Sequence, residues 1–205
     1  MNSRNIQRLR RQFRYRFRRF TWGGAWAATL SAKNRRNLTL FFYDGLFAAA
    51  SDKIILTYIT IFLLTLGATR QQIGLLSSLS NLIAAFLLLP AALLVERTGA
   101  RQKITLISAT GSRLTILLMA LFPFFFRAPS AFIWIILGMA LLREAFNNIG
   151  FPGWMALTGD VVPLEGRGRY FGTRNFIMGI AGIITALITG EFITRIGEPL
   201  GYQIA

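Results

Sequence analysis

The stretch ERTGARQK, residues 96–103, separates two long apolar runs. These runs cover residues 72–95 and 104–126. Each can cross a bilayer as a helix, because a helix rises ~1.5 Å per residue and the hydrocarbon core is ~30 Å thick. A bridge this short predicts a tight turn between two spanning helices. Three of its eight residues are Lys or Arg, which predicts that the turn lies on the cytoplasmic side.

The composition indicates that this chain is surrounded by lipid. Of its 205 residues, 54% are hydrophobic and 18 are Phe, which is more apolar surface than a soluble domain of this size covers. The net charge of +15 is concentrated in residues 1–37, which hold 11 of the 23 Lys and Arg residues and no acidic residue. The rest of the chain has 12 basic and 8 acidic residues. No nucleic-acid partner is expected, because most of the chain is predicted to be embedded in a membrane.

The basic segment at the N-terminus, residues 4–20, alternates Arg with apolar residues three or four positions apart. This spacing places the apolar residues on one helical face. The segment is either an amphipathic helix on the anionic inner leaflet or a disordered basic tail. Trp22 and Trp26, which follow it, suit an anchor at the membrane interface.

Five segments are long and apolar enough to span a membrane, and apolar character returns at residues 201–205 as a sixth begins. The five cover residues 38–66, 72–95, 104–126, 131–155 and 171–194. Seventeen basic residues are assigned to the inside, in the arm, in the bridge and after the fourth span (Arg167, Arg169 and Arg174), against three in the outer turns. We therefore expect an all-α integral membrane protein with a cytoplasmic N-terminus, an arm at residues 1–37 and a helical bundle at residues 38–205.

Two charged motifs resemble those of the major facilitator superfamily. The bridge resembles that family's loop between helices two and three, through Leu94, Arg97, Gly99 and Arg101, although Ala92, Glu96 and Ala100 depart from the family pattern. A second run resembles the family's loop between helices four and five, through Asp160, Pro163, Arg167, Gly168 and Gly172.

The resemblance implies one half of a twelve-helix transporter. On this interpretation the chain is the N-terminal piece of a longer protein, cut at the start of its sixth helix, and its partners are the bilayer and the missing C-terminal half. It would carry a small solute across the plasma membrane by alternating access, with a proton or sodium ion as a possible coupling ion. The alternative is an assembly factor or anchor that uses the same scaffold without transport.

The charged bridge suits a cytoplasmic gating loop. Gly99 allows a left-handed turn. Arg97 and Arg101 can donate to carboxylates of neighbouring helices, and Glu96 can accept from an Arg or a helix N-terminus. The resemblance implies that such a loop stabilises the outward-facing state. The alternative is a set of charges that only fixes the topology, and the same two interpretations apply to Arg167 and Arg169 in the second loop.

Ionisable residues inside the spans are candidates for binding the solute or a coupling ion, because a charge in the membrane is costly unless it faces a cavity or a partner. These candidates are Asp44, Asp52, Lys53, Arg113, Arg143 and Glu144. Five of them lie near the middle of their predicted spans, whereas Asp44 lies nearer the inner end of its span. The alternative is that they pair with one another and only fix the positions of the helices.

The residue inventory argues against enzyme chemistry. The chain has no Cys and no His, so thiolate or imidazole metal sites are excluded, and it has no phosphate-binding glycine loop. We therefore expect no enzyme, metal or cofactor. Glu191 and Arg195, four residues apart, predict an ion pair on one helix.

Overall fold

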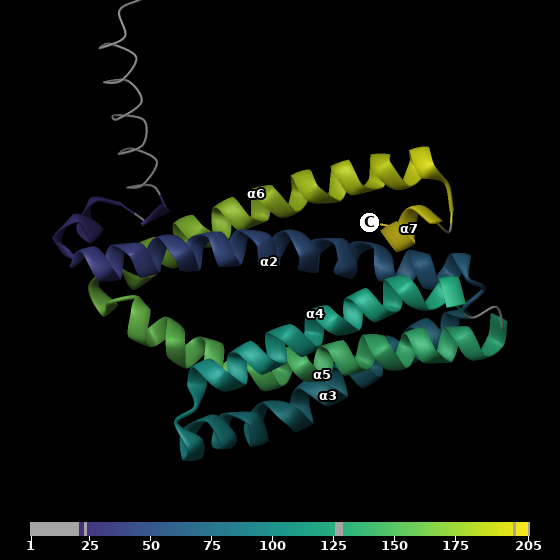
Figure 1. Cartoon of the computed structure of the whole chain (residues 1–205), viewed down its shortest axis with the longest axis horizontal. Helices are drawn as coiled ribbons and strands as arrows, with labels where there is room; N and C mark the ends of the chain where they lie inside the picture. Colours follow the sequence, from purple (N-terminus) through teal and green to yellow (C-terminus); the bar gives the residue numbers. More distant parts are fainter. Residues whose placement is uncertain (1–20, 23, 126–128, 199, 205) are drawn as a thin grey trace, which may run out of the picture. The chain divides into compact units, whose positions relative to one another are not determined.

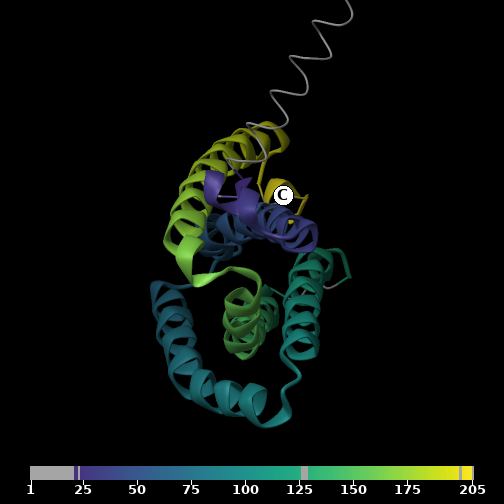
Figure 2. The same cartoon turned by 90° about the vertical axis from the view of Figure 1, so that its left-hand side faces the viewer.

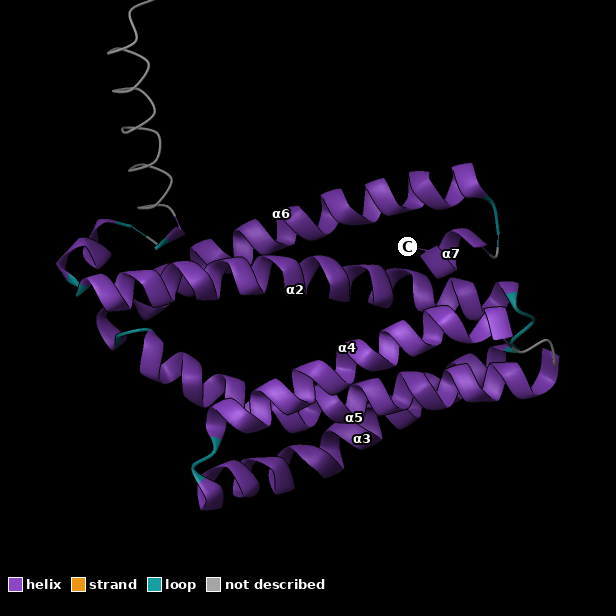
Figure 3. Cartoon of the chain, in the orientation of Figure 1, coloured by secondary structure: helices purple, strands orange, loops and turns teal. Residues whose placement is uncertain are grey.

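The computed structural model describes residues 21–22, 24–125, 129–198 and 200–204, and every regular element within these ranges is helical (Figure 3). A short 3-10 helix, η1, precedes the six α-helices that Figure 1 shows in chain order. Their bounds are η1 Ala25–Thr29, α2 Ala32–Thr65, α3 Arg70–Thr98, α4 Arg101–Phe125, α5 Pro129–Val161, α6 Leu164–Ile196 and α7 Leu200–Ile204. Helices α2 to α6 are long and apolar enough to cross a membrane, which confirms the five predicted spans.

The helices extend beyond the predicted apolar spans. Helix α6 has 33 residues, about 50 Å of helix against a hydrocarbon core of about 30 Å. Continuing the helix into the headgroup region keeps its backbone hydrogen bonds satisfied. One prediction was wrong for this reason: Arg167 and Arg169 lie within α6, not in a loop before it, and only Val162 and Pro163 connect α5 to α6.

Local sequence signals set the ends of α3. Thr69 caps its N-terminus: the Thr69 hydroxyl accepts from the Gln72 backbone N–H, and the Gln72 side chain accepts from the Thr69 backbone N–H. Gly99 ends the helix in the left-handed conformation, at φ 63°, where a side chain is disfavoured. The predicted left-handed turn at Gly99 is therefore confirmed.

The chain forms two compact units, and unit 1 consists of the residues up to Lys53 together with Gly159–Ala186. Its core holds Trp22, Ala27, Leu38, Val162 and Tyr170. The Trp22 indole N–H donates to the Thr39 hydroxyl at 2.8 Å, and the Trp22 side chain is only 8% exposed. Trp22 is therefore packed inside the protein, and the prediction that it anchors the chain at the membrane interface was wrong.

Within unit 1, α2 and α6 pack side by side as parallel helices (Figure 1). The Tyr170 hydroxyl donates to the Leu38 carbonyl at 3.0 Å, and one turn further along, Arg174 lies over the ring of Phe41. Residue numbers rise together on both helices, which is the signature of a parallel pair. We call this contact the α2–α6 seam: Leu38, Phe41 and Gly45 against Tyr170, Arg174 and Met178.

Unit 2 consists of Ile54–Thr158 and Leu187–Ala205. In both views, α5 lies between α3 and α4 (Figures 1 and 2). Its core surrounds Ile136 of α5, which is fully buried, and includes Leu63, Leu76 and Met119 from three other helices. Helices α4 and α5 are antiparallel. Their α4–α5 seam joins Gly111 to Phe146, Ser108 to Gly150 and Thr105 to Gly153.

Large apolar side chains also cover the outside of both units. Phe47 in unit 1 is 72% exposed, and Phe86 in unit 2 is 70% exposed. In water, so many exposed Leu, Ile and Phe side chains would cause association, whereas acyl chains cover them at no comparable cost. The arrangement is that of a membrane bundle.

Candidate functional site

The loop between α3 and α4 places four predicted gating residues at the ends of two helices. Glu96 and Arg97 lie exposed in the last turn of α3, Gly99 makes the turn, and Arg101 begins α4. The link that lies outside both helices is only Gly99 and Ala100, shorter than the eight-residue bridge suggested. The charged side chains are therefore held on rigid helix ends.

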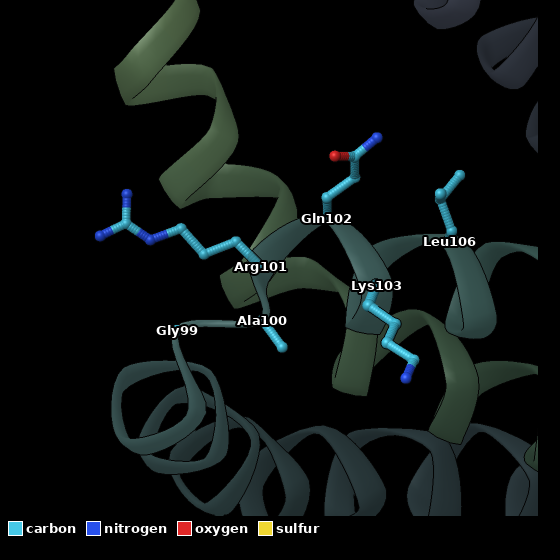
Figure 4. Close-up of a pocket in the computed structure, with 6 residues that line it drawn as sticks. All are labelled: Gly99, Ala100, Arg101, Gln102, Lys103 and Leu106. Atoms are coloured by element: carbon cyan, nitrogen blue, oxygen red, sulfur yellow. The ribbon is translucent and has the colours of Figure 1, made fainter.

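Figure 4 shows a shallow pocket at this turn. It is lined by Gly99, Ala100, Arg101, Gln102, Lys103 and Leu106. The side chains of Arg101 and Lys103 point in different directions, and Gln102 points in a third. Two cations in the first turn of α4 add to the partial positive charge of that helix end. The loop is thus a cationic surface whose charges are spread over several directions.

The second predicted loop is held together by Arg167. Its guanidinium donates from Nη2 to the carbonyls of Gly159 and Val162, both at 3.1 Å. Gly159 lies in the last turn of α5 and Val162 directly follows that helix, where carbonyls lack partners within the helix. Of the other predicted residues, Asp160 is exposed in the last turn of α5, Pro163 lies in the link, and Gly168 faces open space. Arg167 therefore fixes the geometry of the α5–α6 link.

In unit 2, the predicted pair Arg143 and Glu144 forms an ion pair on α5. Arg143 Nη1 lies 2.7 Å from Glu144 Oε1. The Arg143 side chain is 3% exposed and that of Glu144 is 29% exposed. Asn148 donates from its side chain to the Glu144 carbonyl one turn later. Helix α5 therefore carries an ion pair whose arginine is buried and whose carboxylate is partly exposed.

The other candidates are distributed over both units. Arg113 is exposed on α4 in unit 2, where it donates to the carbonyl of Ala109 in its own helix. Asp44, Asp52 and Lys53 belong to unit 1 and are exposed on α2. The proximity of these three to Arg143 and Glu144 stays a prediction. Among the residues that the structure describes, no group of three or more acidic side chains could hold a metal ion.

Arg174 is the site residue that sequence reasoning missed. It was counted only among the basic residues of the inner side, and it lies ten residues inside α6 with a side chain that is 7% exposed. Its guanidinium carbon lies 5.1 Å from the centre of the Phe41 ring. The signal that could have found it is the spacing of Tyr170, Arg174 and Met178, four residues apart on one helical face.

A comparison with protein families shows which family the chain belongs to. Residues 45–205 match the Major Facilitator Superfamily, which covers most of the chain and all five long helices in whole or in part. The chain belongs to the Major Facilitator Superfamily. No curated protein and no solved structure matched it. Membership agrees with both charged motifs and with the all-α membrane fold.

As a Major Facilitator Superfamily member, the chain is a multi-pass membrane protein of a family of transporters. Both charged motifs and all candidate charges except Asp44 fall inside the matched range. Asp44 lies one residue before it, beside Gly45, the first matched residue.

Proposed function

We propose that the protein is a secondary transporter that moves a small solute through the membrane by alternating access. The observation that carries the proposal is the charged pair Arg143–Glu144 within the spanning helix α5 of a Major Facilitator Superfamily member. Charges inside a spanning helix are rare in membrane proteins and usually line a substrate or ion pathway. Glu144, the more exposed partner, is the proposed ligand, and Arg143 orients it.

On this proposal the chain supplies the N-terminal half of the transporter. Support comes from the order of its motifs, since the first follows the second span and the second follows the fourth. The other half would carry the remaining helices, and the two halves would rock against each other around a site near the midplane. We place Glu144 at that site and the loop Glu96–Arg101 on the gating surface.

The proposed orientation puts the N-terminus in the cytoplasm, and the proposed location is the plasma membrane. The basic residues at the start of α2, Lys33, Arg35 and Arg36, support the orientation because Lys and Arg are retained on the cytoplasmic side. A single cysteine introduced at Ser31 tests it. A membrane-impermeant thiol reagent should label that cysteine only after the cell envelope is opened, since the chain has no other Cys.

Transport itself is tested in proteoliposomes that contain the protein expressed from its complete reading frame. A panel of radiolabelled organic acids, amino acids and sugars is screened by counterflow, which needs no ion gradient. Uptake of at least one solute is expected, and Glu144→Gln should reduce it at least tenfold while Glu191→Gln, which removes an exposed carboxylate, should not. If folded protein exchanges no solute and Glu144→Gln changes nothing in growth or uptake, a non-transporting role on the same scaffold replaces the proposal.

A further inference from the structure

Lys53 is a cation in the middle of a spanning helix. It lies between Leu38, where the predicted apolar span begins, and Thr65, the last residue of α2, about 20 Å along the helix from each. The four-carbon stem of a lysine is far shorter than that, so the ammonium group cannot reach the water at either membrane surface. Its charge therefore has to be compensated at this depth.

Helix α6 holds the stem of the Lys53 side chain. A methyl group at Gly182 would lie 3.4 Å from Cγ, 3.6 Å from Cβ and 3.7 Å from Cδ of Lys53. Three consecutive stem carbons thus lie against the glycine, at a place where a larger residue would displace them. Both residues belong to unit 1, and Lys53 nevertheless stays exposed. The glycine therefore orients the stem and leaves the residue accessible.

The described part of the chain supplies no counter-charge for Lys53, which makes no hydrogen bond or ion pair within it. Asp52, one residue earlier, interacts with other groups of the protein and not with Lys53. The ion pair of Arg143 and Glu144 is neutral as a pair, so it leaves the charge of the solute open. An ammonium group has three N–H donors to offer. An anion from outside the described residues is what compensates them.

We propose that Lys53 binds the carboxylate of a monoanionic organic acid, and that this acid is the solute that the transporter carries. Carboxylate oxygens accept the charge-assisted hydrogen bonds that an ammonium group donates. One ammonium group matches one negative charge, whereas a dicarboxylate or a phosphate ester would leave a second charge uncompensated at this depth. The inference rests on the proposed transport function and names the class of its solute.

The test measures binding at equilibrium, on the protein expressed from its complete reading frame and held in nanodiscs. Its melting temperature is followed by tryptophan fluorescence at increasing concentrations of acetate, lactate, benzoate or phenylacetate, since a ligand that binds the folded protein stabilises it. Each acid is paired with its amide, which has nearly the same shape and no charge. At least one acid should raise the melting temperature while its amide does not. No response to any acid, or an equal response to an acid and its amide, overturns the proposal.

Removing the charge of Lys53 should remove the response to the acid. In Lys53→Gln the dissociation constant of the acid should rise at least about tenfold, because the carboxylate loses its partner. Lys53→Arg keeps the charge and should lose less affinity. Lys33→Gln removes an exposed cation from the inner end of the same helix and should change nothing. Unchanged acid binding in Lys53→Gln contradicts the proposal.

The melting temperature without any acid separates this role from a structural one. A lysine that pairs with a carboxylate elsewhere in the protein would destabilise the ligand-free protein when it is replaced. A lysine that receives its counter-charge from the solute carries an uncompensated charge in the ligand-free state. Ligand-free Lys53→Gln should therefore melt at the wild-type temperature or above it. A lower melting temperature assigns Lys53 to an ion pair within the protein and overturns the proposal.

A second variant keeps the test valid if Lys53→Gln does not fold. Gly182→Val displaces the Lys53 stem without removing its charge, because a Cβ there already lies 3.4 Å from Lys53 Cγ, and it should weaken acid binding severalfold. Gly179→Val is its matched control, since a Cβ at Gly179 meets no atom within 4 Å. Wild-type affinity in Gly182→Val contradicts the proposal.

The binding assay and the counterflow assay fail separately. Acid binding without exchange of any solute would keep the Lys53 site and remove the transport function. Exchange of an uncharged sugar without any acid binding would keep the transport function and remove the Lys53 site.

Discussion

The α2–α6 seam of unit 1 and the α4–α5 seam of unit 2 join membrane helices by different means. The first is held by side chains with polar ends, since Tyr170 donates to a carbonyl and Arg174 lies on an aromatic ring. The second is held by the absence of side chains, since Gly111, Gly150 and Gly153 each face a neighbouring helix at contact distance. Lipid offers no hydrophobic drive for association, so close packing and polar contacts remain as the available forces.

The difference has a functional consequence. A seam of small residues fixes the distance between the two helix axes and has no room for larger side chains. A seam of polar groups fixes the register of one helix against the other and places a charge deep within the membrane helices. Each unit carries a buried cation: Arg174 lies in the polar α2–α6 seam of unit 1, whereas Arg143 of unit 2 is paired with Glu144 on its own helix. Four pairs of variants test the two units.

The largest effect is expected from filling the α4–α5 seam. A methyl group at Gly153 would lie 2.7 Å from the Thr105 hydroxyl and 3.0 Å from the Arg101 backbone carbonyl, which cannot move aside. Gly153→Leu should lower the free energy of unfolding by about 3 kcal/mol, measured by equilibrium unfolding in mixed micelles. Gly138→Leu on the same helix is the control, because a methyl group there meets nothing within 4 Å. Equal stability of the two variants would show that this seam is not closely packed.

Two ion pairs in unit 2 have nearly the same length and very different burial. The Arg143–Glu144 distance is 2.7 Å and the Glu191–Arg195 distance is 2.8 Å, but Arg143 is 3% exposed while Arg195 is 77% exposed. Glu144→Gln should cost about 2 kcal/mol of unfolding free energy, below the 3–5 kcal/mol of fully buried pairs because Glu144 is 29% exposed. Glu191→Gln should change the free energy by about 0.5 kcal/mol or less. Similar losses in the two variants would contradict the burial argument.

A smaller loss is expected at the start of the α2–α6 seam. The hydroxyl of Thr39 accepts the only hydrogen bond shown for the Trp22 indole N–H within the described residues, at 2.8 Å. Thr39→Val leaves that buried donor unpaired and should lower the unfolding free energy by about 1.5 kcal/mol. Thr39→Ser keeps the hydroxyl and should retain most of the stability. Tryptophan fluorescence during unfolding measures both variants, and a loss in Thr39→Ser equal to that in Thr39→Val would assign the effect to packing.

The smallest effect is expected from the Tyr170 hydroxyl. Tyr170→Phe removes its hydrogen bond to the Leu38 carbonyl and should cost about 0.6 kcal/mol, the average for such bonds between membrane helices. Tyr43→Phe, at an exposed position of the same unit, serves as the control. A loss several times larger would mean that the hydroxyl sets the register of the whole seam. That result would sharpen the contrast with the α4–α5 seam.

Local signals were sufficient to predict much of the fold. The apolar runs correctly predicted the five spans, and Gly99 correctly predicted the left-handed turn. The four-residue spacing of Glu191 and Arg195 correctly predicted their ion pair. Each of these depends on residues close in sequence. The helix ends were less predictable, because a spanning helix continues past its apolar part for as long as the backbone gains hydrogen bonds.

The candidate site was predicted only in part. Arg143 and Glu144 stood out because charges are rare in a spanning segment, and they do form a pair. Arg174 did not stand out, because it lies near the start of the predicted span at residues 171–194, whereas the helix itself begins at Leu164 and places Arg174 ten residues inside. The basic arm at residues 4–20 lies outside the described residues, and its helical periodicity stays a prediction.

The sequence by itself determined the five segments, all among the described residues, that are long and apolar enough to cross a membrane, and the likeness to the major facilitators, because hydropathy and two charged motifs are local properties. Tertiary structure decided which charges are buried and against what. Arg174 and Trp22 both looked like residues of a membrane surface, yet each is enclosed by residues far along the chain. Burial depends on which helices pack together, and that pairing is set by contacts between distant residues such as Gly45 and Arg174.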